Sequence, residues 1–206
     1  LSDVYASLAK PLYSLAIINL PETKLSIQTN QLTHVLAGAL LAHSQAGARL
    51  VGGHTSEGGG LSVGFAVTGS DAKLPAETPP ALDKDFRLIL TKPIGTGVIM
   101  AANRQLKADA ICVDDAIASM RLSNQLAADV FRENNIIAAT DVTGFGLARH
   151  AQNLAVRLGL AGCVIDLPSV PLLHGVTPLF EAGIASSLHE QNQRAIPIYN
   201  TGKIPP

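Results

Sequence analysis

The sequence contains no tryptophan, and aromatic residues make up only 4% of its 206 residues. Charged residues are also scarce, at 15%, and the formal net charge is −1. The chain therefore lacks the excess of positive charge with which proteins bind nucleic acid or an anionic membrane surface. No apolar run approaches the roughly 20 residues of a membrane-spanning helix. We expect neither a nucleic acid nor a membrane as a partner, and a core that is aliphatic and rich in alanine.

Several common chemical motifs are also missing. The two cysteines, Cys112 and Cys163, form neither a metal-binding pattern nor a disulfide framework. They fit a reducing, cytoplasmic compartment, where we expect them to be small buried apolar residues. A partial dinucleotide fingerprint begins at residue 95, but Met100 replaces its third glycine. The glycine spacing of a P-loop ends at Ser70, where lysine would be required, so both nucleotide motifs are excluded.

Hydrophobic periodicity predicts alternating strands and helices in two domains. Residues 71–85 are polar and contain Pro75, Pro79 and Pro80, which predicts a linker between a domain at 1–70 and a second at 86–206. Gly47 is expected to end the first long helix, and Thr29 or Asn30 to cap its start. The expected strands are 12–20, 49–51, 61–68, 86–91, 136–140 and 163–167, and the expected helices are 26–46, 98–105, 115–133, 146–158 and 172–182.

The stretch 52–60, GGHTSEGGG, is the richest in glycine and lies just before a predicted strand. We expect a turn here, because so much glycine weakens a helix or strand interior. Its backbone N–H groups could cradle a phosphate, with His54 and Thr55 donating hydrogen bonds and Glu57 orienting a cation or water. The alternative is a flexible connection of a hairpin without a ligand.

Two aspartates are candidate ligands for a hard cation. Asp3 precedes an apolar run, and Asp141 follows one directly before a predicted helix. Ligands of α/β proteins bind at such strand ends, and Mg²⁺ prefers oxygen ligands and bridges to phosphates. The alternatives are a helix cap for Asp141 and plain solvent exposure for Asp3. Lys92 either helps to bind an anion or is an exposed residue at a turn. His34 and His43 are expected on the helix surface.

Several segments resemble, in the same order, the selenophosphate synthetase (selenide, water dikinase) family of the aminoimidazole ribonucleotide synthetase-like superfamily. The resemblance extends along nearly the whole chain, and the ordered set is more specific than any one segment. These segments are LSDVYA at 1–6, KP at 10–11, GGHT at 52–55, LTKPIGTG at 90–97 and DVTGFGL at 141–147, with a weaker match of SL at 187–188 before Asn192.

The resemblance implies an α/β (α+β) fold with a two-domain, synthetase-like architecture. The N-terminal domain would pair across a homodimer into a β-barrel, and the C-terminal domain would hold a sheet flanked by helices. The implied reaction converts ATP, selenide and water to selenophosphate, AMP and phosphate, and requires Mg²⁺. Asp3 then matches a ligand of Mg²⁺ and ATP, and Asp141 matches a further Mg²⁺ ligand. Gly53, His54 and Thr55 match a segment that reaches ATP from the partner subunit.

The chain also departs from the family pattern. It lacks the N-terminal glycine-rich segment with a reactive cysteine or selenocysteine and a lysine, some further aspartates, and the closing C-terminal strands. We therefore expect a fragment that is catalytically incomplete, with no catalytic residue of its own. Two alternatives remain at this point. The chain could belong to another ATP-using enzyme of the superfamily, or it could be a non-catalytic nucleotide-binding or dimerisation module.

Overall fold

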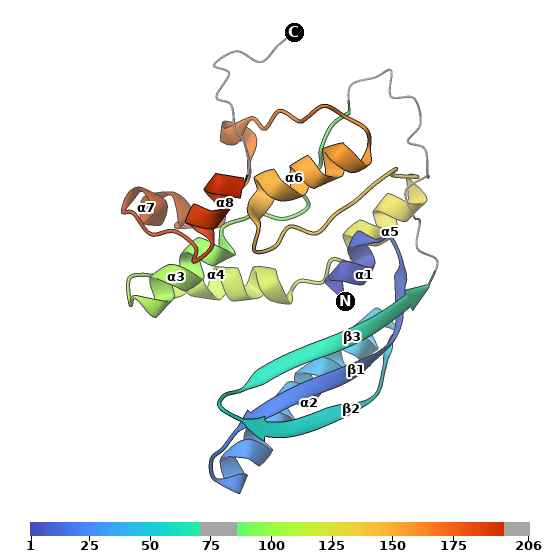
Figure 1. Cartoon of the computed structure of the whole chain (residues 1–206), viewed down its shortest axis with the longest axis vertical. Helices are drawn as coiled ribbons and strands as arrows, with labels where there is room; N and C mark the ends of the chain where they lie inside the picture. The colour runs from blue at the N-terminus through green and yellow to red at the C-terminus, as the bar shows by residue number, and fades with distance from the viewer. Residues whose placement is uncertain (71–85, 196–206) are drawn as a thin grey trace. The chain divides into compact units, whose positions relative to one another are not determined.

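A computed structural model describes residues 1–70 and 86–195, which form two compact units (Figure 1). Among these residues, unit 1 comprises 1–70 together with 128–136, and unit 2 comprises 86–127 and 137–195. The predicted linker at 71–85 lies outside the described residues. No helix in the described ranges is both long enough and apolar enough to cross a membrane.

Unit 1 is a small sheet with one long helix on one face (Figure 1). The central strand β1 pairs in parallel with β2 and antiparallel with β3, so the strand order is β2-β1-β3. The parallel pair is joined through α2, which makes a β-α-β crossover. The elements are α1 (Ser2–Ala6), β1 (Lys10–Pro21), α2 (Leu25–Ala46), β2 (Arg49–Gly58), β3 (Ser62–Ser70) and α5 (Gln125–Glu133), of which residues from 128 belong to this unit.

The core of unit 1 follows from the alternation of side chains along β1. Ala16, Ile18 and Leu20 are buried and pack against leucine and valine side chains of α2. Successive residues of a strand point to opposite faces, so Leu15 and Ile17 lie on the other face, where they are 46% and 59% exposed. One face of the sheet is therefore covered by α2, while the other presents apolar side chains to solvent.

A buried polar pair links β1 to the end of α2. Ser14 Oγ lies 2.6 Å from His43 Nε2, and His43 Nδ1 lies 2.7 Å from the carbonyl oxygen of Ala39. Because that carbonyl can only accept, Nδ1 carries the ring proton and Nε2 accepts from the serine hydroxyl. The prediction that His43 lies on the surface is wrong, since its ring faces the sheet, whereas His34 is exposed as predicted.

The glycine-rich stretch is not the predicted turn. Residues 49–58 form one continuous strand, β2, which pairs with β1 from Tyr13 to Pro21. The ladder compensates for the low strand propensity of glycine. At Gly53 a Cβ atom would lie 2.0 Å from the carbonyl oxygen of Ala16, so the close approach of the two backbones requires glycine there. Only residues 59–61 form the turn into β3.

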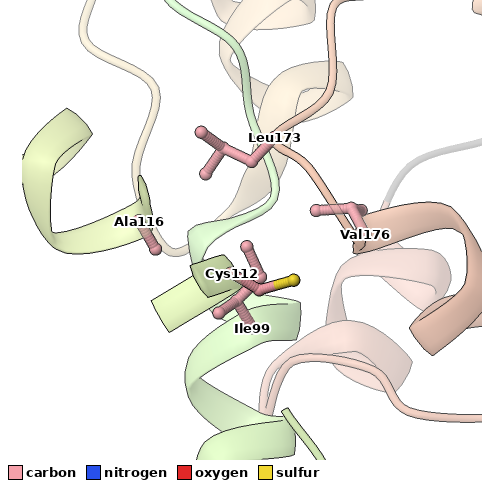
Figure 2. Close-up of a cluster of buried hydrophobic side chains, with 5 residues drawn as sticks. All are labelled: Ile99, Cys112, Ala116, Leu173 and Val176. Carbon is pink, nitrogen blue, oxygen red and sulfur yellow. The ribbon is translucent and has the colours of Figure 1, made fainter. Parts of the chain in front are cut away.

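Unit 2 is built from short helices around an aliphatic core (Figure 2). Ile99, Cys112, Ala116, Leu173 and Val176 are buried against one another. Cys112 is thus the small buried residue that we expected, but Cys163 is exposed, contrary to prediction. The elements are α3 (Thr96–Arg104), α4 (Ala110–Arg121), α6 (Gly146–Arg157), the short 3₁₀ helix η1 (Leu167–Ser169), α7 (Val176–Glu181) and α8 (His189–Ala195).

Three predicted strands of the second domain do not form in the described part of unit 2. Residues 86–91, 136–140 and 163–167 carry no strand, and within the described ranges the one isolated bridge joins Ile94 to Leu172. A strand is stabilised by its hydrogen-bonded neighbours, and among the described residues these three segments have no neighbouring strand. The three segments have the apolar pattern of a strand, but the pattern alone does not provide a neighbouring strand to pair with.

The boundaries of the helices were predicted with mixed success. The helix that ends at Gly47 does so in the left-handed conformation, with φ 67°, as predicted. It begins at Leu25, however, so Thr29 and Asn30 are not its cap. The predicted helix 115–133 is two helices, because Leu122 is extended and the Ser123 hydroxyl accepts a hydrogen bond from the Gln125 N–H.

Candidate functional site

The candidate site lies in unit 2, at the turn 141–146 that leads into α6. The turn is closed by a hydrogen bond from the Gly146 N–H to the carbonyl oxygen of Thr143, at 2.9 Å. Gly146 has φ 77°, a left-handed conformation that glycine adopts without strain. Asp141 stands at the start of the turn with its side chain 30% exposed. A carboxylate is thereby presented to solvent from a defined backbone.

His150, on the second turn of α6, reaches back to this turn. Its Nε2 atom accepts a hydrogen bond from the Thr143 N–H at 3.2 Å and lies 3.3 Å from the Thr143 hydroxyl. In a neutral imidazole the proton is then on Nδ1, which lies 3.8 Å from Oδ1 of Asp141. The His150 ring is buried, so its orientation is fixed by packing as well as by these contacts.

Asn192, on α8, holds the same turn from another element. Its side-chain Nδ2 donates a hydrogen bond to the carbonyl oxygen of Gly144 at 2.9 Å. This residue lies 48 positions further along the chain, so the contact depends on the tertiary fold. The turn that carries Asp141 is therefore fixed at Thr143 by α6 and at Gly144 by α8.

A groove of about 370 Å³ adjoins the turn. It is lined by one side of α3, by Gly144, and by residues 186–188, and Arg104 is the one cationic side chain among the lining residues. Its walls are closely packed, since a Cβ atom on Gly97 would lie 3.0 Å from that of Ser186, and one on Gly144 would lie 3.2 Å from Leu188. The two glycines thus allow the three segments to meet.

The donor set at the turn fits Mg²⁺ bound through few protein ligands. In the described ranges no three His, Cys, Asp or Glu side chains cluster as a metal site. Asp141 accepts one side-chain hydrogen bond, from the Thr140 hydroxyl at 3.4 Å, which leaves further oxygen lone pairs for a cation. Mg²⁺ commonly keeps several waters and uses one or two carboxylates together with substrate phosphates. A single, partly exposed carboxylate on a fixed turn meets that requirement.

The other predicted site residues belong to unit 1. Asp3 lies exposed on the short helix α1. Gly53, His54 and Thr55 are consecutive residues of β2, where His54 pairs with Ile17 and Thr55 with Ile18. Because Ile18 is buried against α2 and Ile17 is exposed, the side chains of His54 and Thr55 point to opposite faces. Only one of them can reach a ligand on the open face through its side chain.

Lys92 is not simply an exposed residue at a turn, and its role in binding an anion stays a prediction. Its ammonium group donates to the carbonyl oxygens of Ser119, at 3.2 Å, and of Leu122, at the C-terminal end of α4. Partial burial lowers the pKa of Lys92 below its ordinary value. Lys92 therefore stabilises the C-terminal end of α4, since a cation there compensates the negative end of the helix dipole.

Comparison with known structures identifies the class of fold. The thiamine-monophosphate kinase of Stenotrophomonas maltophilia superimposes with a TM-score of 0.64 at 18% identity, covering 94% of this chain and 69% of that one. A second structure, AaThiL complexed with AMPPCP and TMP, has a TM-score of 0.57 at 19% identity and covers 77% of this chain and 50% of that one. The fold is therefore the mixed α/β, two-domain architecture that the sequence predicted. The predicted sheet of the C-terminal domain, however, does not form among the described residues of unit 2. The β-barrel across a homodimer stays a prediction.

The sequence then places the chain within one family. The N-terminal domain of AIR synthase related proteins matches residues 1–70, and their C-terminal domain matches residues 85–190. The chain belongs to this family. The selenide, water dikinase of Geobacter metallireducens is 41% identical in an alignment of 187 positions that covers 89% of this chain and 53% of that protein. The selenide, water dikinase of Caldanaerobacter subterraneus is 34% identical in an alignment of 209 positions, gaps included, that covers 99% of this chain and 57% of that protein. The chain spans little more than half the length of these relatives.

The sequence did not predict a site role for two residues of the turn's surroundings, His150 and Asn192. From the sequence, His150 is expected to be a structural histidine of a helix, and Asn192 is only the last residue of a weak motif match. The spacing from Thr143 to His150 is the one local signal, because it places His150 on the second turn of a helix that starts at the turn. Asn192 comes from a different element, so no local spacing could have paired it with Gly144.

Proposed function

We propose that the protein of which this chain forms part catalyses the synthesis of selenophosphate from ATP, selenide and water, with AMP and phosphate as the other products. The proposal rests on the names of the relatives at 34–41% identity and on one structural observation. That observation is the turn 141–146, which presents the Asp141 carboxylate from a backbone held by two other elements. We include in the proposal a cytoplasmic location and a division into domains at 1–70 and 86–206, joined at 71–85.

Asp141 would hold Mg²⁺ in this reaction. We propose Asp3, in unit 1, separately as a ligand of Mg²⁺ and ATP. The bound metal would neutralise negative charge on the phosphates of ATP. Asp141 serves this role because its carboxylate is accessible and its backbone is fixed, so little ordering is needed when the cation binds. We propose that Gly53, His54 and Thr55 contact ATP bound to a partner subunit, with the backbone of β2 and one of the two side chains as donors.

We propose further that the protein is a homodimer in which the open face of the unit 1 sheet is covered by a second copy. Leu15 and Ile17 of β1 and Val51 of β2 are 46%, 59% and 58% exposed. Apolar side chains on a sheet face that lacks a covering layer favour association with another sheet. A second copy would supply a matching apolar face, as in the two-fold interfaces that most homodimers use.

Phosphorus NMR on the natural full-length protein with Mg-ATP, with and without selenide, tests the reaction. We expect AMP, phosphate and a selenophosphate resonance only when selenide is present. Formation of ADP, or turnover that is indifferent to selenide, would reject selenophosphate synthesis and indicate another ATP-using enzyme of the family. Binding of ATP without any turnover would indicate a nucleotide-binding module.

The metal role of Asp141 has its own test. Asp141→Asn removes the negative charge but keeps the size of the side chain, so we expect at least about 10-fold weaker binding of Mg²⁺-ATP with an unchanged fold. Isothermal titration with Mg²⁺-ATP measures the affinity, and circular dichroism checks the fold. Asp166→Asn, a change at an exposed carboxylate near η1, is the matched control. An affinity that is equal in Asp141→Asn and in the control would count against the metal role.

A further inference from the structure

We propose that His150 and Asn192 are positioning residues that hold the turn 141–146 in the conformation in which Asp141 binds its cation. The inference rests on the proposed metal role of Asp141. It adds two residues, from α6 and α8, that do not themselves touch the metal or the substrate. It is carried by the two hydrogen bonds that these side chains make to the backbone of the turn.

His150 acts on the turn as an acceptor. The N–H of Thr143 donates to Nε2 at 3.2 Å, and this is a backbone group that the turn's own hydrogen bond does not use, since the Gly146 N–H bonds to the Thr143 carbonyl oxygen. The ring is only 8% exposed and also lies near Phe145, with 6.4 Å between ring centroids. A buried acceptor that receives a backbone N–H fixes the direction of that peptide plane.

The same ring also faces Asp141. With Nε2 accepting in a neutral ring, the proton is on Nδ1, which lies 3.8 Å from Oδ1 of Asp141. This separation is too long for a direct hydrogen bond but short enough to favour one orientation of the carboxylate. Residues that orient a metal ligand from behind commonly affect metal affinity. His150 therefore joins the backbone of the turn to the side chain that it presents.

Asn192 acts as a donor at the next residue. Its Nδ2 bonds to the Gly144 carbonyl oxygen at 2.9 Å, and Gly146 is close enough that a Cβ there would lie 3.8 Å from the same nitrogen. Gly144 lines the groove, and a Cβ atom on it would lie 3.2 Å from the side chain of Leu188, another lining residue. Loss of Asn192 would thus free the turn on the side of the groove, while loss of His150 would free it on the side of Asp141.

The test is Mn²⁺ binding to the full-length protein, measured by electron paramagnetic resonance with the metal alone. We expect His150→Leu to weaken Mn²⁺ binding by about 10-fold, the usual cost of removing a partner behind a metal ligand. His150→Gln should stay within about 3-fold of the parent, because the glutamine oxygen reaches the position of Nε2 and can accept the Thr143 N–H. Asn192→Ala should weaken binding, whereas the exposed neighbour Gln193→Ala and the exposed α6 change Asn153→Ala should not.

Amide exchange at residues 142–146 is measured on the same variants. Faster exchange in His150→Leu and Asn192→Ala, with a protected turn in His150→Gln, supports the positioning role. A folded His150→Leu protein that binds Mn²⁺ as tightly as the parent overturns it, as does an equal loss in His150→Leu and His150→Gln. If Asp141→Asn itself binds Mn²⁺ normally, the metal role of Asp141 fails instead, and the exchange data then decide separately whether the two residues hold the turn.

Discussion

At the scale of single residues, the structure shows which glycines could be replaced by a residue with a side chain and which could not. Gly52 and Gly53 are adjacent in β2, yet a Cβ atom would meet very different surroundings at each. On Gly52 it would lie 3.5 Å from the Leu15 side chain, an ordinary contact, whereas on Gly53 it would lie 2.0 Å from the carbonyl oxygen of Ala16. The GGHT segment therefore has a structural reason for its second glycine that is independent of any ligand.

This contrast gives a direct prediction. Gly53→Ala should destabilise the protein by about 2–3 kcal/mol, because β1 and β2 must separate to admit the methyl group. Gly52→Ala is the matched control and should change the free energy of unfolding by less than about 1 kcal/mol. Urea denaturation followed by circular dichroism measures both. Equal stability of the two variants would show that the strands separate at little cost, and that the glycine serves another purpose.

At the scale of elements, α4 depends on a residue far outside it. Lys92 lies 27 positions before Ser119, and the ammonium group bonds to the Ser119 and Leu122 carbonyl oxygens, which have no partner within the helix. The chain must leave the helix at Leu122, where the backbone becomes extended, and α5 begins three residues later at Gln125. Lys92 therefore stabilises the end of α4 shortly before the chain passes from unit 2 to unit 1 at residue 128.

We predict that Lys92→Met loosens this helix end. The change keeps much of the side-chain length but removes both charged hydrogen bonds, so the protein should lose about 1 kcal/mol of stability. Hydrogen exchange at residues 119–123 should become faster, while α3 stays protected. Lys107→Met, at an exposed lysine after α3, serves as the control. Unchanged exchange at 119–123 would indicate that the carbonyl groups are satisfied equally well by water.

The same scale shows what the sequence could and could not predict. Elements whose signals are local were predicted well, such as α2 with Gly47 at its end and α6 after the turn at 141–146. Elements that depend on partners were not. Glycine-rich residues 52–58 form a strand because β1 lies beside them, and the apolar segment 136–140 forms none because no described strand pairs with it. At the site, Asp141 was predicted from its position, whereas Asn192 needed the fold to reach Gly144.

At the scale of the whole molecule, the most informative surface is the open face of the unit 1 sheet. A three-stranded sheet buries one face under α2, but the residues of β1 that point away are as apolar as those that point inward. Exposure of these apolar side chains to water is unfavourable, and a second layer packed on the face would remove it. The proposed homodimer accounts for this face without any further element of the chain.

Ile17, at the centre of β1 and 59% exposed, is the residue with which to test the dimer. Ile17→Glu would place an unpaired carboxylate in the proposed interface, at a cost of about 3 kcal/mol, or roughly 100-fold in the dissociation constant. Ala37→Glu introduces the same charge at an exposed position of α2 and should leave association unchanged. Sedimentation velocity over a range of concentrations measures both, with circular dichroism to show that each variant is folded.

If the parent protein is monomeric at every concentration, or if Ile17→Glu associates as strongly as Ala37→Glu, then a second copy does not cover this face. Since the interface test requires no nucleotide, its outcome is independent of the reaction proposed for the site in unit 2.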